Sequence, residues 1–94
     1  MLKFNVRRAG SLIAGELHGI FISPSAIKFK NEISAKDLSG LILPHDHLQW
    51  VASDGKPYSA VILKVSPLFP EEMPMVGKGA TVTLDQEISD QARK

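Results

Sequence analysis

The sequence predicts an all-β fold: a small antiparallel barrel, OB-like or SH3-like, of about six or seven short strands. Two β-prone runs, Leu48–Ala52 and Tyr58–Val65, flank Asp54-Gly55, and this dipeptide between such runs is the strongest short-range signal for a hairpin. Elsewhere, short runs of alternating apolar and polar residues are interrupted by Gly and Pro, and such alternation is typical of antiparallel strands with one buried face. With 94 residues, the chain is long enough for one modest core.

The first part of the chain predicts three strands. Residues 2–7 alternate between apolar and polar side chains, which indicates a strand with one buried and one solvent-facing side. The apolar run Leu12–Ile22 contains Gly15 and Gly19, which argue against a helix and favour one bent strand or two short strands joined at a bulge. Ala26–Ile33 alternates again and is expected to form the next strand.

The middle of the chain predicts a helical turn, a short strand and the hairpin. At most one helical turn is expected, over residues 34–40, because Ser34 can cap it and a glycine can end it. Leu41–Leu43 is expected to form a short strand that a proline ends. In the hairpin, a turn of three residues would place Trp50 opposite Tyr58, whereas a turn of two would put them on opposite faces.

The last part predicts a loop, one strand and a tail. Residues 66–79 contain three prolines and two glycines, which favour a loop. Residues 80–84 alternate and are expected to form the last strand. Residues 85–94 are mostly polar and are expected to be a C-terminal tail or a short helix, so the barrel domain is assigned to residues 1–84.

Composition excludes several classes of protein. The chain has no cysteine, which excludes disulfides, thiol catalysis and thiolate metal sites. The N-terminus lacks the continuous apolar stretch of a signal peptide, and the longest nearly apolar run, Ala60–Leu63, is far too short to cross a membrane. We therefore expect a cytoplasmic protein without membrane association, and its compactness favours a phage or another mobile element as its source.

No arrangement of residues indicates catalysis. The chain contains no Gly-x-Ser-x-Gly motif, and Gly77-Lys78-Gly79 is not followed by the helix that a phosphate-binding loop needs. His45 and His47 would point to one side of a strand and could share a metal, but Asp46 would point to the other side. We expect a protein without catalytic residues, cofactor or metal.

Charge is concentrated near the N-terminus. Residues 1–30 contain five basic residues and a single acid, Glu16, although the formal net charge of the whole chain is only +1. Four of them, Lys3, Arg7, Lys28 and Lys30, share with Asn5 the solvent-facing sides of two predicted strands, which would form one patch without nearby acids if these strands were neighbours. Such a patch could bind nucleic acid through phosphate contacts and base stacking, or it could simply keep the barrel soluble. The first hypothesis is a non-enzymatic module for single-stranded nucleic acid, with the site residues Lys3, Arg7, Lys28, Lys30, Lys56 and Tyr58.

The second hypothesis is a module for protein interaction or assembly. The loop over residues 67–77 is rich in Pro and Met, a composition that is typical of adaptable docking segments. Either this loop or an exposed strand edge could bind a protein partner or a second copy of the chain. The candidate residues in the loop are Leu68, Phe69, Met73 and Met75.

A third hypothesis comes from a pair of motifs. Arg7-Arg8 and, later, Asp37-Leu38-Ser39 stand in the order of an Arg-rich segment and an Asp-x-Ser-x-x-Gly strand. This resembles the PilZ-type receptors for cyclic di-GMP, which are barrels of similar length. Gly40 follows Ser39 directly, and Ile42 stands where the family has its glycine. The resemblance implies a cyclic-dinucleotide receptor.

Two further segments are similar to another family. Met1-Leu2-Lys3 opens the chain, and Gly55-Lys56-Pro57-Tyr58 lies in the hairpin. Filamentous-phage proteins that coat single-stranded DNA have an OB-type fold that opens with a similar strand and carries a Gly-x-Pro-Tyr hairpin, although earlier in the chain. This resemblance implies single-stranded DNA as the ligand.

Overall fold

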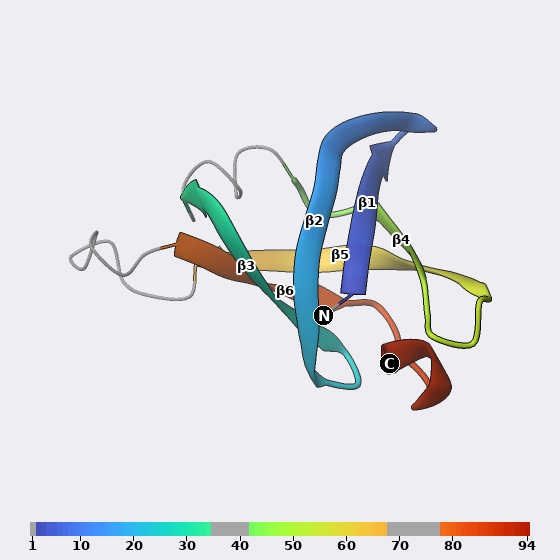
Figure 1. Cartoon of the computed structure of the whole chain (residues 1–94). Helices are drawn as coiled ribbons and strands as arrows, with labels where there is room; N and C mark the ends of the chain where they lie inside the picture. Colours follow the sequence, from blue (N-terminus) through green and yellow to red (C-terminus); the bar gives the residue numbers. More distant parts are fainter. Residues whose placement is uncertain (1, 35–41, 68–77) are drawn as a thin grey trace.

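The computed structural model describes residues 2–34, 42–67 and 78–94, and this part of the chain forms a closed barrel of antiparallel strands (Figure 1). The strands are β1 (Leu2–Arg8), β2 (Ser11–Ser23), β3 (Ala26–Ser34), β4 (His47–Val51), β5 (Pro57–Pro67) and β6 (Lys78–Leu84). A 3-10 turn, η2 (Gln91–Arg93), lies near the C-terminus. The structure therefore confirms the predicted all-β class and antiparallel barrel, with six strands in the described part of the chain.

The strand order around the barrel is β1-β2-β3-β6-β5-β4, and β4 also pairs with β1. The chain thus forms two meanders, β1–β3 and β4–β6, which meet along the β3–β6 and β1–β4 pairs. Since each described strand is paired with two neighbours, the barrel closes without an edge strand in this part of the chain.

The apolar run with two glycines forms a single long strand, β2, which is one of the two predicted alternatives. This strand curves near its beginning, where its pairing with β1 shifts register (Figure 1). At Gly19 its backbone passes close over the core, since a Cβ atom there would lie 2.8 Å from Ile27 Cγ2 and 2.9 Å from the Phe29 ring. Only a residue without a side chain fits this crossing without displacing its neighbours.

The core consists of the apolar side chains that alternate along the strands, as the sequence pattern predicts. Its aromatic centre is Phe4, whose ring lies 5.4 Å from the Phe29 ring and 5.3 Å from the Trp50 ring, centroid to centroid. The buried apolar residues that form the core cluster are Phe4, Val6, Leu17, Ile27, Phe29, Ile42, Leu48, Trp50, Ala60, Ile62, Ala80, Val82, Leu84, Ile88 and Ala92. The inward face of every described strand contributes to this cluster.

The segment before β4 is a turn around a buried carboxylate, so the predicted strand at 41–43 is wrong for the described residues Ile42 and Leu43. Asp46 is only 3% exposed. Its carboxylate accepts hydrogen bonds from the Leu43 backbone N–H at 2.8 Å and from Arg8 Nε and Nη2 at 2.8 and 2.9 Å. These contacts attach the end of β1 to the turn, while Ile42 fills the core instead of pairing in a sheet.

The C-terminal segment packs against one end of the barrel. Its two apolar side chains, Ile88 and Ala92, belong to the core cluster. The Ala92 carbonyl accepts a 2.8 Å hydrogen bond from Trp50 Nε1, and the Lys94 carbonyl accepts one of 2.8 Å from the Ser53 N–H. Residues 85–94 thus hold the β4–β5 hairpin in place and end in the 3-10 turn η2.

Candidate functional site

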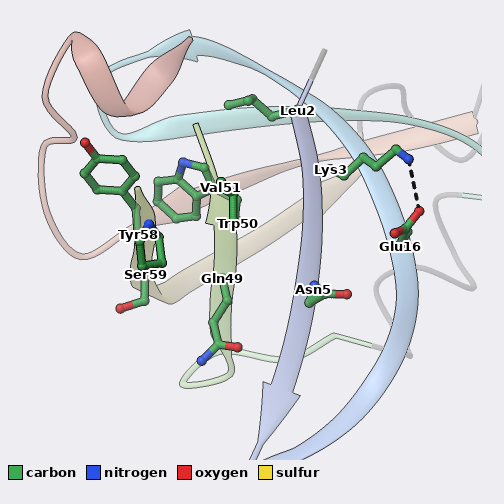
Figure 2. Close-up of a pocket in the computed structure, with 10 residues that line it drawn as sticks. Leu2, Lys3, Asn5, Glu16, Gln49, Trp50, Val51, Tyr58 and Ser59 are labelled. Atoms are coloured by element: carbon green, nitrogen blue, oxygen red, sulfur yellow. Dashed lines mark ion pairs between the residues drawn. The ribbon is translucent and has the colours of Figure 1, made fainter. Parts of the chain in front are cut away.

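A groove lies across β2, β1, β4 and β5, lined both by outward-facing side chains and by side chains at the margin of the core (Figure 2). Its volume is about 830 Å³, and it is partly open to solvent. The residues that line it are Leu2, Lys3, Asn5, Glu16, Gln49, Trp50, Val51, Pro57, Tyr58 and Ser59. The groove joins β1 and β2, from the first part of the chain, to β4 and β5, from a later part. It therefore depends on the pairing of β1 with β4, which closes the barrel.

Polar side chains from three neighbouring strands line the groove in one row. Asn5 on β1 pairs with Gln49 on β4, and Gln49 pairs with Ser59 on β5. Their neighbours along the strands point into the core, so these three side chains face outward. The row offers amide and hydroxyl groups to a ligand on the surface.

Two aromatic side chains lie on the β5 side of the groove. Trp50 and Tyr58 are register partners, as predicted for a turn of three residues, since the Ala52 N–H donates a 3.2 Å hydrogen bond to the Lys56 carbonyl and leaves residues 53–55 as the turn. Their rings stack with centroids 6.1 Å apart and an interplanar angle of 26°. Trp50 is buried, whereas Tyr58 is half-buried and remains accessible from the groove.

The Tyr58 ring is held in place by Asp54 in the hairpin connection. Its hydroxyl donates a 2.6 Å hydrogen bond to Asp54 Oδ2, and Asp54 Oδ1 accepts another from the Lys56 N–H at 2.9 Å. The bond to the carboxylate raises the pKa of Tyr58, and it also lowers the pKa of Asp54, with help from the Lys56 N–H. The ring is therefore neutral and fixed in orientation, as a stacking platform requires.

On the other side of the groove, Lys3 is paired with an acid. Lys3 Nζ lies 3.5 Å from Glu16 Oε2, and both side chains are 62% exposed (Figure 2). The expectation of a basic patch without nearby acids is therefore wrong here. It fails because the antiparallel pairing of β1 with β2 brings Glu16 beside Lys3.

Arg7 is joined to the groove through Gln49. Its Nε donates a 2.8 Å hydrogen bond to Gln49 Oε1, and its Nη1 donates a 3.2 Å bond to the Gly10 carbonyl. Both contacts hold the guanidinium group beside the β1–β4 pair. Arg7 thus lies next to the groove but is already engaged within the fold.

The structure does not unite all the predicted basic residues. β2 lies between β1 and β3, so the two strands expected to be neighbours are separated. Lys28 on β3 pairs with Ile20 and Thr81 and lies outside the groove, and Lys30 is also a β3 residue. Lys56 is exposed in the hairpin connection, next to the groove residue Pro57.

Several predicted features fall outside the described residues. These are the loop residues Leu68, Phe69, Met73 and Met75, the Asp37 and Ser39 of the cyclic di-GMP resemblance, and the helical turn over 34–40 apart from Ser34, which ends β3. The arginines of that resemblance are both engaged within the fold, Arg7 with Gln49 and Arg8 with Asp46.

The two histidines do not share a strand face. His47 begins β4, whereas His45 lies in the preceding turn with a positive φ of 78°. Within residues 2–34, 42–67 and 78–94, no three His, Asp or Glu side chains gather in a way that could hold a metal ion. The same ranges contain no helix of the length and hydrophobicity needed to span a bilayer.

Sequence reasoning missed Gln49, Ser59 and Glu16 as groove residues. The signal for Gln49 and Ser59 is present in the hairpin, because Trp50 opposite Tyr58 places Gln49 opposite Ser59. Their position beside Asn5 has no local signal, since it depends on the β1–β4 pair between distant segments. Comparisons of the chain with protein-family models, with curated proteins and with solved structures find no match.

Proposed function

We propose that this protein is a non-enzymatic module that binds single-stranded nucleic acid in the groove over β1, β4 and β5. The observation that carries the proposal is the combination of an accessible aromatic ring and a cation in one open groove. Tyr58 supplies the ring on the β5 side, and Lys3 supplies the cation on the β1 side. The polar row of Asn5, Gln49 and Ser59 lines the same groove.

The geometry suits a single strand better than a duplex. A base can stack on Tyr58 only if its own face is free, and the bases of a duplex are stacked on each other. Lys3 and Tyr58 line the same groove, and their strands, β1 and β5, are separated by two interstrand spacings, roughly 10 Å. One single-stranded nucleic acid can therefore contact the Tyr58 ring and the Lys3 ammonium group together. Base–aromatic stacking contributes about 1–3 kcal/mol per base and tolerates any sequence.

The test is a fluorescence anisotropy titration of the full chain with labelled oligo(dT) over a range of salt concentrations. We expect binding at low salt that weakens as salt increases, with a logarithmic slope of about 0.7 per phosphate contact. Lys3→Ala should reduce this slope by about one contact. Tyr58→Ala should weaken binding by about five-fold or more at every salt concentration, because stacking is not screened.

Lys64→Ala is the matched control for the loss of a cation. Lys64 is exposed on β5 but does not line the groove, so its loss should leave affinity and slope nearly unchanged. The absence of binding at low salt would refute the proposed function. Equal weakening by Lys64→Ala and Lys3→Ala would show that nucleic acid binds through general charge and not in the groove.

Glu16→Gln is expected to strengthen nucleic-acid binding. Glu16 competes with phosphate for Lys3 and repels the ligand's charge, and glutamine removes both effects while keeping the size of the side chain. We expect about three-fold tighter binding at low salt, and a difference that disappears at high salt. The exposed ion pair contributes little to stability, so the barrel should remain folded.

The same anisotropy titration measures this change, with Glu87→Gln as the control. Glu87 is exposed and does not line the groove, so its replacement should have little effect. An unchanged affinity after Glu16→Gln would mean that Lys3 does not contact the ligand.

A further inference from the structure

Gln49 lines the groove with a fixed amide orientation. Its Oε1 accepts the 2.8 Å hydrogen bond from Arg7 Nε. A guanidinium group has no acceptor, so only the amide oxygen of Gln49 can face Arg7. The amide nitrogen must take the other direction, and Figure 2 shows it turned away from Asn5.

The two N–H donors of Gln49 are available to a ligand. The side chain is exposed and lines the groove between Asn5 and Ser59. Within the described ranges, no protein group accepts a hydrogen bond from its Nε2. A glutamine side chain can both donate and accept hydrogen bonds. Because Arg7 occupies its amide oxygen, Gln49 presents its N–H donors to the groove.

We propose that Gln49 makes the groove selective for bases with a carbonyl at the edge it contacts, thymine or uracil and guanine, over cytosine and adenine. This inference rests on the proposed function. Thymine O4 and guanine O6 are acceptors, whereas cytosine and adenine carry amino donors at the equivalent positions. A donor facing an amino group leaves both groups without a partner, which weakens the binding of that base.

The groove also offers room for the base to reach Gln49. Gln49 and its register partner Ser59 both face outward and line the groove, so a base bound there can bring its edge to the polar row. Arg7 acts as a positioning residue, because it orients Gln49 without itself lining the groove. A phosphate oxygen would be an equally good acceptor for the same N–H groups, and the experiment separates these two sources.

The test compares oligo(dT) with oligo(dC). Both bases are pyrimidines, but thymine carries a carbonyl at position 4 where cytosine carries an amino group. We expect the unmodified protein to bind oligo(dT) about five-fold more tightly. Gln49→Glu keeps an acceptor for Arg7 but replaces the donor by a second oxygen. Its added charge weakens the binding of both oligonucleotides alike, so the ratio of their two affinities reports the base contact. We expect this ratio to fall to about one or to invert.

Gln49→Met removes the donor without adding charge, and it should also abolish the preference for oligo(dT). Near-ultraviolet circular dichroism of Trp50 shows that both variants are folded. Equal weakening of oligo(dT) and oligo(dC) in both variants would assign the Gln49 donor to phosphate and overturn base selectivity, as would an unmodified protein without preference. Failure of the unmodified protein to bind either oligonucleotide would instead refute the proposed function itself.

Discussion

Replacing Phe4 by alanine is expected to lower the free energy of unfolding by about 4 kcal/mol. Phe4 is fully buried, and its ring contacts the rings of Phe21, Phe29 and Trp50. Truncation leaves a cavity at the centre of the aromatic cluster, which the closed barrel cannot collapse to fill. Because small domains have total stabilities of about 5–15 kcal/mol, this loss is a large part of the whole.

Chemical denaturation followed by Trp50 fluorescence measures this effect. Phe4→Leu is the control, since it keeps most of the buried volume and should cost less than about 1.5 kcal/mol. A loss below about 1 kcal/mol for Phe4→Ala would contradict the packing described for the core. The change also matters for the groove, because Phe4 lies in β1 between the groove residues Lys3 and Asn5.

Replacing Asp46 by alanine is expected to lower the free energy of unfolding by about 2–3 kcal/mol. The variant loses the bonds from Arg8 and leaves the Leu43 N–H without its partner. The half-exposed guanidinium of Arg8 can be hydrated after the loss, which keeps the cost below the roughly 3–5 kcal/mol of breaking a fully buried ion pair. Asp90→Ala, which removes two surface ion pairs, with Arg93 and with Lys94, should cost less than about 1 kcal/mol.

The contribution of Asp46 should also depend on pH. The hydrogen bonds from Arg8, followed by that from the Leu43 N–H, hold the pKa of Asp46 below its ordinary value in the folded state. Its stabilising effect is therefore fully present above the pKa of the unfolded carboxyl, about 3.9, and is lost as the pH falls through the lower folded pKa. Acid titration of unfolding should show a shallower loss in Asp46→Ala than in the unmodified protein, and equal slopes would contradict this assignment.

The local parts of the fold could be predicted from the sequence. Alternating residues identified the strands and the inward side chains, and Asp54-Gly55 identified the hairpin that sets Trp50 opposite Tyr58. The prediction of a strand at Ile42 was wrong, because a short apolar stretch can fill a core from a turn as well as from a strand. In the C-terminal segment, the two apolar residues are the ones that reach the core.

The candidate site could be predicted only in part, because it depends on which strands are neighbours. Lys3 and Tyr58 meet in one groove since β1 pairs with β4, a contact between distant segments that no local pattern specifies. For the same reason, Lys28 falls outside the groove, with β2 between its strand and β1. The orientation of the Gln49 amide depends on its hydrogen bond from Arg7, a contact that only the folded chain reveals.

The most direct test of the groove as the binding site is an NMR titration of the isotope-labelled chain with oligo(dT) at low salt. We predict that the largest amide shift changes occur at Lys3, Asn5, Gln49 and Tyr58. Residues on the far strands, such as Lys28 and Thr81, should change little. Shift changes centred on β3 and β6, or none at all, would contradict the assignment of nucleic-acid binding to this groove.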